Sequence, residues 1–418
     1  MKICRFKKWS LAAKAAVMIT MASSMLVITP AAQATPAFAR ATGAECLKCH
    51  TTSFPRLNWT GERFMRNGFA LPKTGEALDV GFPGEADTTQ KTTSDLAMVK
   101  DIGNYLSVRG KMTILDQPDT DSAKKSIGSP NWLQFFVSGH LAPDVPFWAE
   151  AQIATDGGSA GDGSTELHNY FVGWTNVLKD RSAESATLVN FRAGGFTPTE
   201  WTSVSDQKRS IDSASSHPGA YRGKNGFTQV GKGLGIKTGI EYYGYTDSFL
   251  WAAAVGNDTG QNFNDKKRSS GTQYWLVGRF DFMEGSSISL LHMNYGVDNG
   301  SADDLTSDTL SANWRIGTDI DLRAQYSVDN SGVGAVDDVS GYTLQGDWTF
   351  VRGMSAILRY DTTDNGAAAD SEATQATAAL VWAPWQNIKL TAAYINEMEA
   401  ASAAAEADTM SLQLQFAM

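Results

Sequence analysis

The chain ends in the stretch Met410-Ser411-Leu412-Gln413-Leu414-Gln415-Phe416-Ala417-Met418, in which apolar and polar residues alternate almost without exception. Successive side chains of a β-strand point to opposite faces, so this alternation places one set of residues on each face. The first set is apolar and comprises Met410, Leu412, Leu414, Phe416 and Met418, and the second is polar and comprises Ser411, Gln413 and Gln415. The pattern predicts a strand with one apolar and one polar face.

Similar stretches, rich in aromatic and β-branched residues, recur toward the N-terminus as far as position 104. Such residues favour strands, and we distinguish about sixteen stretches of this kind. They begin near Asn104, Asn131, Pro146, Glu166, Ala186, Lys232, Asp247, Thr272, Ser286, Thr306, Asp319, Ser340, Gly353, Thr374, Gln386 and Asp408.

The links between these stretches alternate in length. Short links include 141–145, 244–246, 283–285, 317–318 and 351–353, and long polar links include 117–130, 197–231, 257–271 and 330–339. Bacterial outer-membrane barrels have short periplasmic turns and long external loops. The sequence therefore predicts an all-β fold, a transmembrane outer-membrane barrel of about sixteen antiparallel strands, with both termini on the periplasmic side.

Aromatic residues gather at the predicted strand ends, where they fit the aromatic girdles of a membrane barrel. They are Trp132, Phe147, Trp148, Tyr170, Trp251, Trp275, Trp348, Tyr360, Trp382, Trp385 and Tyr394. A soluble protein of several sheets, with these rings in its core, is the alternative. The regular alternation of loop lengths and the polar opposite faces of the strands favour the barrel.

Residues 1–34 have the three parts of a secretory signal peptide: a basic start, an apolar stretch over 15–28, and the cleavage site Ala32-Gln33-Ala34. A membrane-anchoring helix is the alternative, but the apolar stretch is short and interrupted by Thr and Ser. The signal contains five Lys and Arg and no acid, so cleavage changes the formal net charge from −10 to −15. A chain this acidic is a poor binder of nucleic acid.

The sequence predicts a covalent haem at Cys46-Leu47-Lys48-Cys49-His50, because C-x-x-C-H is the attachment motif of c-type haem. Two thioether bonds fix the porphyrin edge, and the adjacent imidazole reaches the iron as proximal ligand. Cys4 leaves with the signal, so the motif uses both cysteines of the mature chain. Zinc would need further ligands, and a thioredoxin-like redox site would leave His50 without a role.

The sixth iron ligand is less defined. Met65 follows the motif closely and is our candidate for the distal metal ligand, with an open or water-bound position as the alternative. Further methionines and the histidines of the barrel and loop sequence remain, namely Met98, Met112, His140, His168, His217 and His292.

We expect residues 35–103 to form a monohaem cytochrome c segment that precedes the porin-like barrel of residues 104–418. The prolines of this segment, at 36, 55, 72 and 83, argue against long helices. A sixteen-strand barrel encloses a real channel, so we expect the segment to plug the lumen. Its aromatic residues Phe54, Trp59, Phe64 and Phe69 are then expected to pack on the macrocycle.

The stretch from Phe38 to His50, with Phe54-Pro55-x-Leu57-Asn58-x-x-Gly61 and Phe64-x-x-Asn67-Gly68-Phe69, resembles the fused outer-membrane cytochrome–porins. The best-known members are the iron oxidases of iron-oxidising bacteria. The resemblance implies a monohaem cytochrome joined to a sixteen-strand barrel, with Cys46, Cys49 and His50 holding the haem. The detailed match covers only this stretch. A weaker likeness joins residues 190–198 to a strand end of anion-selective porins.

Two classes of function follow from these features. In the first, the haem accepts electrons from an extracellular donor, favoured as Fe(II), and a periplasmic c-type cytochrome collects them; electron transfer outward to an external acceptor would use the same parts. In the second, the protein is a diffusion porin with a haem plug. Acidic residues of the long loops are expected to raise the local concentration of Fe(II) collectively, and they are Asp119, Asp121, Asp258, Asp265, Asp303, Asp304, Asp337, Asp338, Asp364, Asp370 and Glu372.

Overall fold

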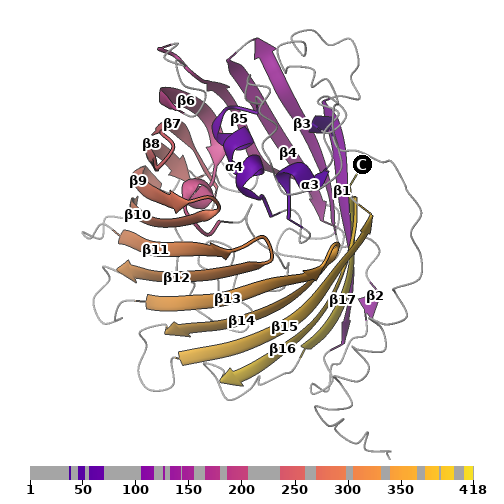
Figure 1. The fold of residues 1–418 in the computed structure, drawn as a ribbon. Coiled ribbons are helices and arrows are strands. Elements are labelled where there is room, and N and C mark those ends of the chain that lie inside the picture. The colour runs from indigo at the N-terminus through magenta and orange to yellow at the C-terminus, as the bar shows by residue number, and fades with distance from the viewer. Residues whose placement is uncertain are drawn as a thin grey trace, which may run out of the picture. The chain divides into compact units, whose positions relative to one another are not determined.

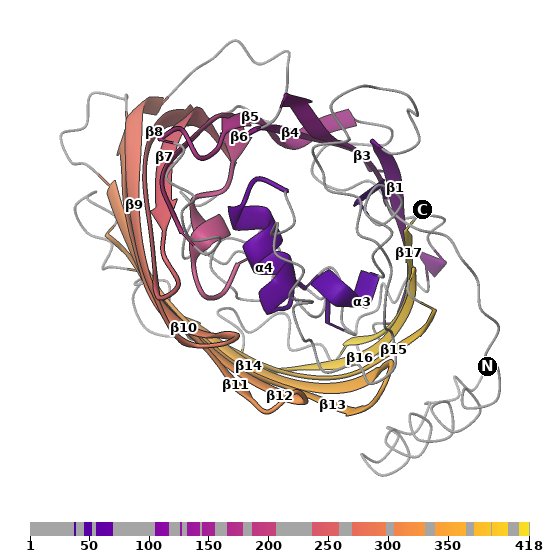
Figure 2. The same cartoon turned by 45° about the horizontal axis from the view of Figure 1, so that its top comes forward.

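Sixteen long antiparallel strands close into a barrel, in which short helices lie (Figure 1 and Figure 2). The computed structural model describes residues 37–38, 46–51, 56–69, 105–116, 126–127, 132–142, 144–154, 165–178, 186–205, 236–258, 270–297, 305–330, 339–364, 372–385, 387–399 and 409–417. The chain divides into two compact units, Met1–Gln33 and Ala34–Met418, and the described residues all belong to the second. The predicted signal peptide lies outside them.

The long strands are β1 (Leu106–Asp116), β3 (Trp132–Ala142), β4 (Val145–Ala154), β5 (Thr165–Trp174), β6 (Thr187–Phe196), β7 (Lys237–Tyr245), β8 (Phe249–Asp258), β9 (Ser270–Met283), β10 (Ser286–Val297), β11 (Leu305–Ile316), β12 (Ile320–Asn330), β13 (Val339–Val351), β14 (Met354–Asp364), β15 (Glu372–Trp385), β16 (Ile388–Glu399) and β17 (Thr409–Ala417). A two-residue strand, β2 (Ser126–Ile127), pairs with β1. The helical elements are α3 (Cys46–Cys49), α4 (Trp59–Arg66) and the 3₁₀ turn η3 (Pro198–Trp201).

Each long strand pairs with its neighbours along the chain, and the pairing of β1 with both β3 and β17 closes the sheet. The predicted barrel of sixteen antiparallel strands is confirmed. Each predicted start lies within two residues of the observed one, except that β7 begins at Lys237 instead of near Lys232. The sequence did not predict β2.

The faces of the barrel are inverted relative to those of a soluble protein. On β12, the inner face carries Asp321, Arg323, Gln325, Ser327 and Asp329, all buried, whereas Leu322 and Tyr326 point outward and are 42% and 48% exposed. The same arrangement holds on β11, where Leu310 and Trp314 are exposed, whereas Ser307, Thr309 and Ser311 are buried. An apolar outer face and a polar inner face are the pattern of transmembrane barrels.

The predicted aromatic girdle is only partly present. Trp348 is 55% exposed on the outer face, as expected. The prediction is wrong for Trp275, which is 0% exposed because it packs with Phe196 on the inner side of the wall. It is also wrong for Trp148, whose ring lies 5.7 Å from that of Phe69 of the N-terminal segment. Both rings therefore face the lumen and pack there against other aromatic rings.

The short links gather at one end of the barrel, where β1 begins and β17 ends. They include 143–144, 246–248, 284–285, 317–319 and 352–353, and this short-turn end is the reference for the site described below. Among the described residues, no helix is long and apolar enough to cross a membrane.

Candidate functional site

The C-x-x-C-H motif forms a single helical turn. Helix α3 spans Cys46–Cys49, and His50 N–H donates to the Cys46 carbonyl at 2.9 Å. Residues three apart lie on the same face of a helix, so Cys46 and Cys49 share a face. Neither cysteine is in a disulfide, and both are partly exposed. His50 forms an isolated β-bridge with Leu57, which folds the chain back toward α4.

Asn58 joins the motif to α4. Its side-chain oxygen caps α4 by accepting from Gly61 N–H at 3.0 Å, and its Nδ2 donates to the carbonyls of Lys48 (3.0 Å) and His50 (3.3 Å). Its own N–H donates to the Cys49 carbonyl at 2.9 Å. A Cβ atom at Gly61 would lie 2.1 Å from the same carbonyl, so only glycine fits there. The backbone of the motif is thereby fixed on the first turn of α4.

The environment of Cys49 disfavours thiolate chemistry. Burial raises the pKa of the Cys49 thiol to about 11, opposed by Lys48 and assisted by Cys46. A thiol that keeps its proton at neutral pH is a poor nucleophile and a poor ligand for zinc. Among the described residues, no group of three or more His, Cys, Asp and Glu side chains is placed to hold a metal ion.

A first buried cluster of ions holds Arg56 against the barrel wall. Arg56 pairs with Asp347 of β13 and, at 3.0 Å, with Asp321 of β12. Arg323 of β12 pairs with the same Asp347, so two arginines and two carboxylates balance in charge. Burial opposes the charge of Arg56, but Asp321 and Asp347 outweigh it and raise the Arg56 pKa above its ordinary value.

A second buried cluster holds α4 itself. Arg66 of α4 contacts Asp281 of β9 at 2.7 Å and Glu62 of α4 at 3.5 Å. Arg279 of β9 contacts Glu62 at 2.6 Å and Asp281 at 2.7 Å. Burial, followed by repulsion from Arg279, lowers the Arg66 pKa, and the two carboxylates compensate in part. Glu62 and Asp281 each contact both Arg66 of the helix and Arg279 of the wall. The cluster of four ion pairs therefore links α4 to β9.

Between the ion clusters, α4 packs on an aromatic part of the inner wall. Phe64, Met65 and Phe69 join one apolar cluster with wall residues that include Phe196, Trp201, Tyr243, Leu250, Trp275 and Leu291. Phe38 packs edge-to-face on Phe64, with ring centroids 5.1 Å apart. Phe64 and Phe69 thus contact the wall in this structure, and their predicted packing on a macrocycle stays a prediction. Phe54 lies outside the described residues.

Hydrogen bonds at the short-turn end add to the apolar contacts between this segment and the wall. Tyr243 Oη donates to the Arg66 carbonyl and Tyr245 Oη to Asn67 Oδ1, both at 3.3 Å. His140 Nε2 lies 2.7 Å from the Gly68 carbonyl oxygen. The segment 56–69 therefore closes onto strands from β3 to β13 near the ends that carry the short turns.

The candidate distal ligands separate by location. Met65 is 8% exposed within the apolar cluster, and its role at the iron stays a prediction. Met112 and His292 point to the outer face, His292 pairing there with Asp308 at 2.8 Å, so neither can reach a group in the lumen. Met98, His217 and the side chain of His168 lie outside the described residues. The same holds for most of the loop acids, including Asp303, Asp304, Asp337 and Asp338.

The link after β6 departs from prediction. We expected 197–231 to be an external loop, but its first part folds against the inner wall. Ser203 N–H donates to Ser289 Oγ at 2.8 Å. Trp201 Nε1 donates to the buried Glu241, which also binds Arg192 at 2.6 Å. Glu200 of the link pairs with Arg192 of β6 at 2.6 Å. These buried contacts hold the start of the link inward, and their partners Ser289 and Glu241 come from strands that are distant in the sequence.

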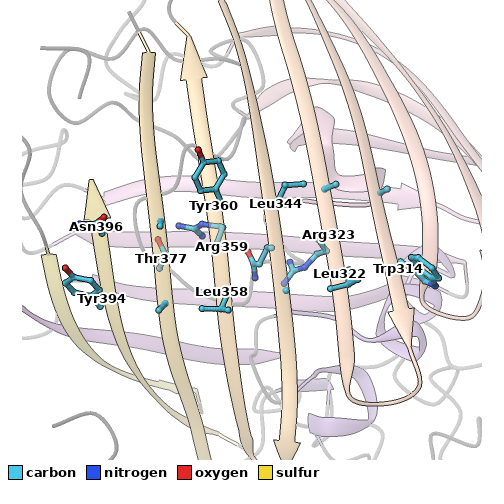
Figure 3. A pocket seen from close by; sticks show the side chains of 16 residues that line it. Trp314, Leu322, Arg323, Leu344, Leu358, Arg359, Tyr360, Thr377, Tyr394 and Asn396 are labelled. Carbon is cyan, nitrogen blue, oxygen red and sulfur yellow. The ribbon is translucent and has the colours of Figure 1, made fainter. Parts of the chain in front are cut away.

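A depression of about 690 Å³ lies in the outer wall between β11 and β16 (Figure 3). Its rim carries outward apolar side chains, among them Trp314, Leu322, Leu344 and Leu358. None of Cys46, Cys49, His50 and Met65 lines it. The depression is thus separate from the candidate site.

No protein-family model matches the chain, and no curated protein matches it. Solved porins match its fold. The OmpF porin of Salmonella typhi, in complex with daunomycin, is 12% identical with a TM-score of 0.57; the match covers 75% of this chain and 97% of that one. An anion-selective porin from Comamonas acidovorans is 17% identical with a TM-score of 0.54, over 75% of this chain and 98% of that one. At these identities the likeness establishes the barrel fold.

Proposed function

We propose that this protein is an outer-membrane electron conduit. One haem c, attached through Cys46 and Cys49 and ligated by His50, accepts electrons from an extracellular donor, most favourably Fe(II), and a periplasmic c-type cytochrome collects them. One observation carries the proposal: the segment that contains the motif is built into the lumen by two buried ion clusters.

The membrane location follows from the inverted faces of the barrel. Exposed apolar side chains such as Leu322, Leu344 and Trp348 would be unfavourable in water over so many strands. They suit a lipid environment, and the closed sheet leaves no unpaired strand edge in it. With an even number of long strands, both ends of the barrel sequence lie at the short-turn end, which is periplasmic in outer-membrane barrels.

The residues of the motif fit a c-type haem. Cys46 and Cys49 share a face and neither is in a disulfide, and His50 follows on the same turn. Asn58 and Gly61 fix the backbone that presents these side chains, so the protein holds the group in a defined orientation. The haem, when bound, supplies a one-electron iron couple whose potential depends on axial ligation and burial.

The packing of the lumen favours a conduit over free diffusion. Inner-wall side chains such as Ser307, Thr309 and Ser327 are 0% exposed, whereas a wide aqueous channel would leave its wall hydrated. The choice of Fe(II) rests on the resemblance of residues 38–69 to the cytochrome–porins. The loop acids that we expect to attract Fe(II) lie mostly outside the described residues.

A diffusion channel with a haem plug is the second candidate. The fold shared with OmpF and with an anion-selective porin favours it, as does the polar inner face of β11 to β13. Electron transfer outward to an external acceptor remains a variant of the first candidate.

Three measurements on the purified full-length protein separate these functions. A conduit is expected to show a haem-stained band at the size of the mature chain, Fe(II)-dependent haem reduction in stopped-flow absorbance, and little conductance in planar bilayers. A neutral small-molecule reductant serves as the control for a reducible haem. Large steady conductance with a haem that Fe(II) does not reduce would support the porin instead, and a chain without covalent haem would overturn both functions.

A further inference from the structure

The inner wall formed by β16, β17 and β1 carries a row of cationic and amide side chains. Lys389, Gln415 and Lys111 are register neighbours across these three strands. Lys389 and Gln415 are 1% and 0% exposed, on the face opposite to the outward Leu390 and Leu414. Thr391 lies two residues from Lys389 on the same face and is also buried. We call Lys111, Lys389, Thr391 and Gln415 the basic row.

Two members of the basic row lack the partners that burial requires. Neither Oε1 nor Nε2 of Gln415 has a hydrogen bond, and Thr391 Oγ1 has none. A buried polar group left without a partner costs on the order of 1 to 3 kcal/mol, so native proteins satisfy nearly all of them. A polar group outside the described residues is therefore expected to bind here.

The basic row lies at the end of the barrel where the haem motif lies. Lys389 is the second residue of β16 and Gln415 is the third from the end of β17, so both are close to the short-turn end. Figures 1 and 2 agree in placing α3 on the side of β16, β17 and β1, whereas α4 lies toward β6 to β10. Helix α3 thus lies on the side of the barrel whose inner wall carries the basic row.

The donor groups of the basic row favour a carboxylate as the bound group. Lysine ammonium groups, an amide N–H and a hydroxyl are donors, and charge-assisted hydrogen bonds to a carboxylate are the strongest they can form. A haem held at Cys46 and Cys49 carries two propionate carboxylates. We propose that Lys389, Gln415 and Thr391 bind a haem propionate, with Lys111 adding positive charge, so that the barrel wall tunes the haem potential. This inference rests on the proposed function.

The test is the pH dependence of the haem reduction potential in the purified full-length protein. A bound propionate titrates, and its ionisation appears as a pH-linked change in potential. In Lys389→Met, loss of the cation is expected to move this change upward by about 1 pH unit. It is also expected to lower the potential at neutral pH, because less positive charge favours the oxidised iron. Gln415→Leu is expected to shift the profile in the same direction by less, and Lys389→Arg to preserve it.

Matched controls exist on other parts of the inner wall. Lys237 of β7 is also a buried lysine, and Gln325 of β12 also has an amide with neither atom hydrogen-bonded. Lys237→Met and Gln325→Leu are expected to leave the profile unchanged.

The outcomes distinguish the two levels of the proposal. A haem-bearing Lys389→Met protein with the parental pH profile would overturn the propionate site alone, and so would an equal shift in Lys237→Met. If Lys389→Met does not assemble, Gln415→Leu decides, since it removes no charge. A parent chain without covalent haem, seen on a haem-stained gel, would overturn the proposed function and this inference with it.

Discussion

Helices α3 and α4 are neighbours in sequence but differ in how they are held. Helix α4 is buried on nearly all sides, with two arginines of its segment in ion clusters and three apolar residues on the wall. The described side chains of α3 are partly exposed, and its backbone is fixed through Asn58 and Gly61 of the α4 segment.

The two helices therefore have different roles: α4 anchors the segment to the barrel wall, and α3 presents the side chains of the motif. Buried ion pairs contribute little net stability but fix geometry, because a charge left without its partner is strongly unfavourable. The side chains of α4 therefore determine where the segment sits. Those of α3 remain available for a cofactor. Substitutions at four places, ordered from the largest expected effect to the smallest, test this division.

Cys46→Ala combined with Cys49→Ala is expected to abolish covalent haem completely, because no other cysteine remains in the mature chain. The haem-peroxidase stain of a denaturing gel should lose its band at the size of the mature chain. The barrel should still assemble, as heat-modifiable migration on a gel would report, because its contacts with the segment come from α4. A retained haem band would refute the attachment, and an unfolded barrel would refute the division between the two helices.

Arg56→Met should release the segment from β12 and β13. Loss of one member of a buried ion cluster costs about 3 to 5 kcal/mol, since Asp321 and Asp347 would then share only Arg323. Protease cleavage within residues 56–69 and bilayer conductance are both expected to rise. Arg63→Met, on the partly exposed side of α4, is the matched control and should change neither. Equal behaviour of the two variants would show that the cluster is no anchor.

Gly61→Ala probes the contact between the two helices. The added methyl group meets the Cys49 carbonyl at 2.1 Å, so α3 must move, at a cost of about 1 to 3 kcal/mol. We expect a shifted Soret band at near-normal barrel stability. Gly278→Ala, where a Cβ would meet nothing within 4 Å, serves as the control. An unchanged spectrum would mean that the position of α3 does not depend on α4.

Asn58→Ala removes the cap of α4 and should destabilise the segment by about 1 kcal/mol. Asn58→Asp sharpens the test, because it keeps the capping oxygen but loses the donor to the Lys48 and His50 carbonyls. Helix stability, from proteolysis rates, should fall only in the alanine variant, whereas the haem spectrum should change in both. A normal haem spectrum in Asn58→Asp would show that the hydrogen bonds from Asn58 Nδ2 do not position the haem motif.

The barrel could be predicted from sequence because its signals are local. Alternation fixes the face of each residue, and link lengths fix the strand boundaries, as the starts at Ser286 and Ile320 illustrate. The C-x-x-C-H motif is local as well. The anchors were missed because Arg56 and Arg66 look like ordinary surface residues until strands more than 200 positions away supply Asp347 and Asp281. Trp275 was misassigned for a different reason: an aromatic ring can lie on either face of a barrel, and its packing with Phe196 is not visible in the local sequence.

These long separations have a consequence for assembly. Arg56 meets Asp347 across 291 positions and Arg66 meets Asp281 across 215. Contacts so distant form late in folding, and the predicted signal peptide implies that the chain is exported from its N-terminus. With such export, the motif would enter the periplasm before β9, β12 and β13 fold around it, which would leave a period in which enzymes that attach haem can reach Cys46 and Cys49. A chain truncated before β12 is expected to keep residues 56–69 open to protease, which pulse-chase proteolysis would measure.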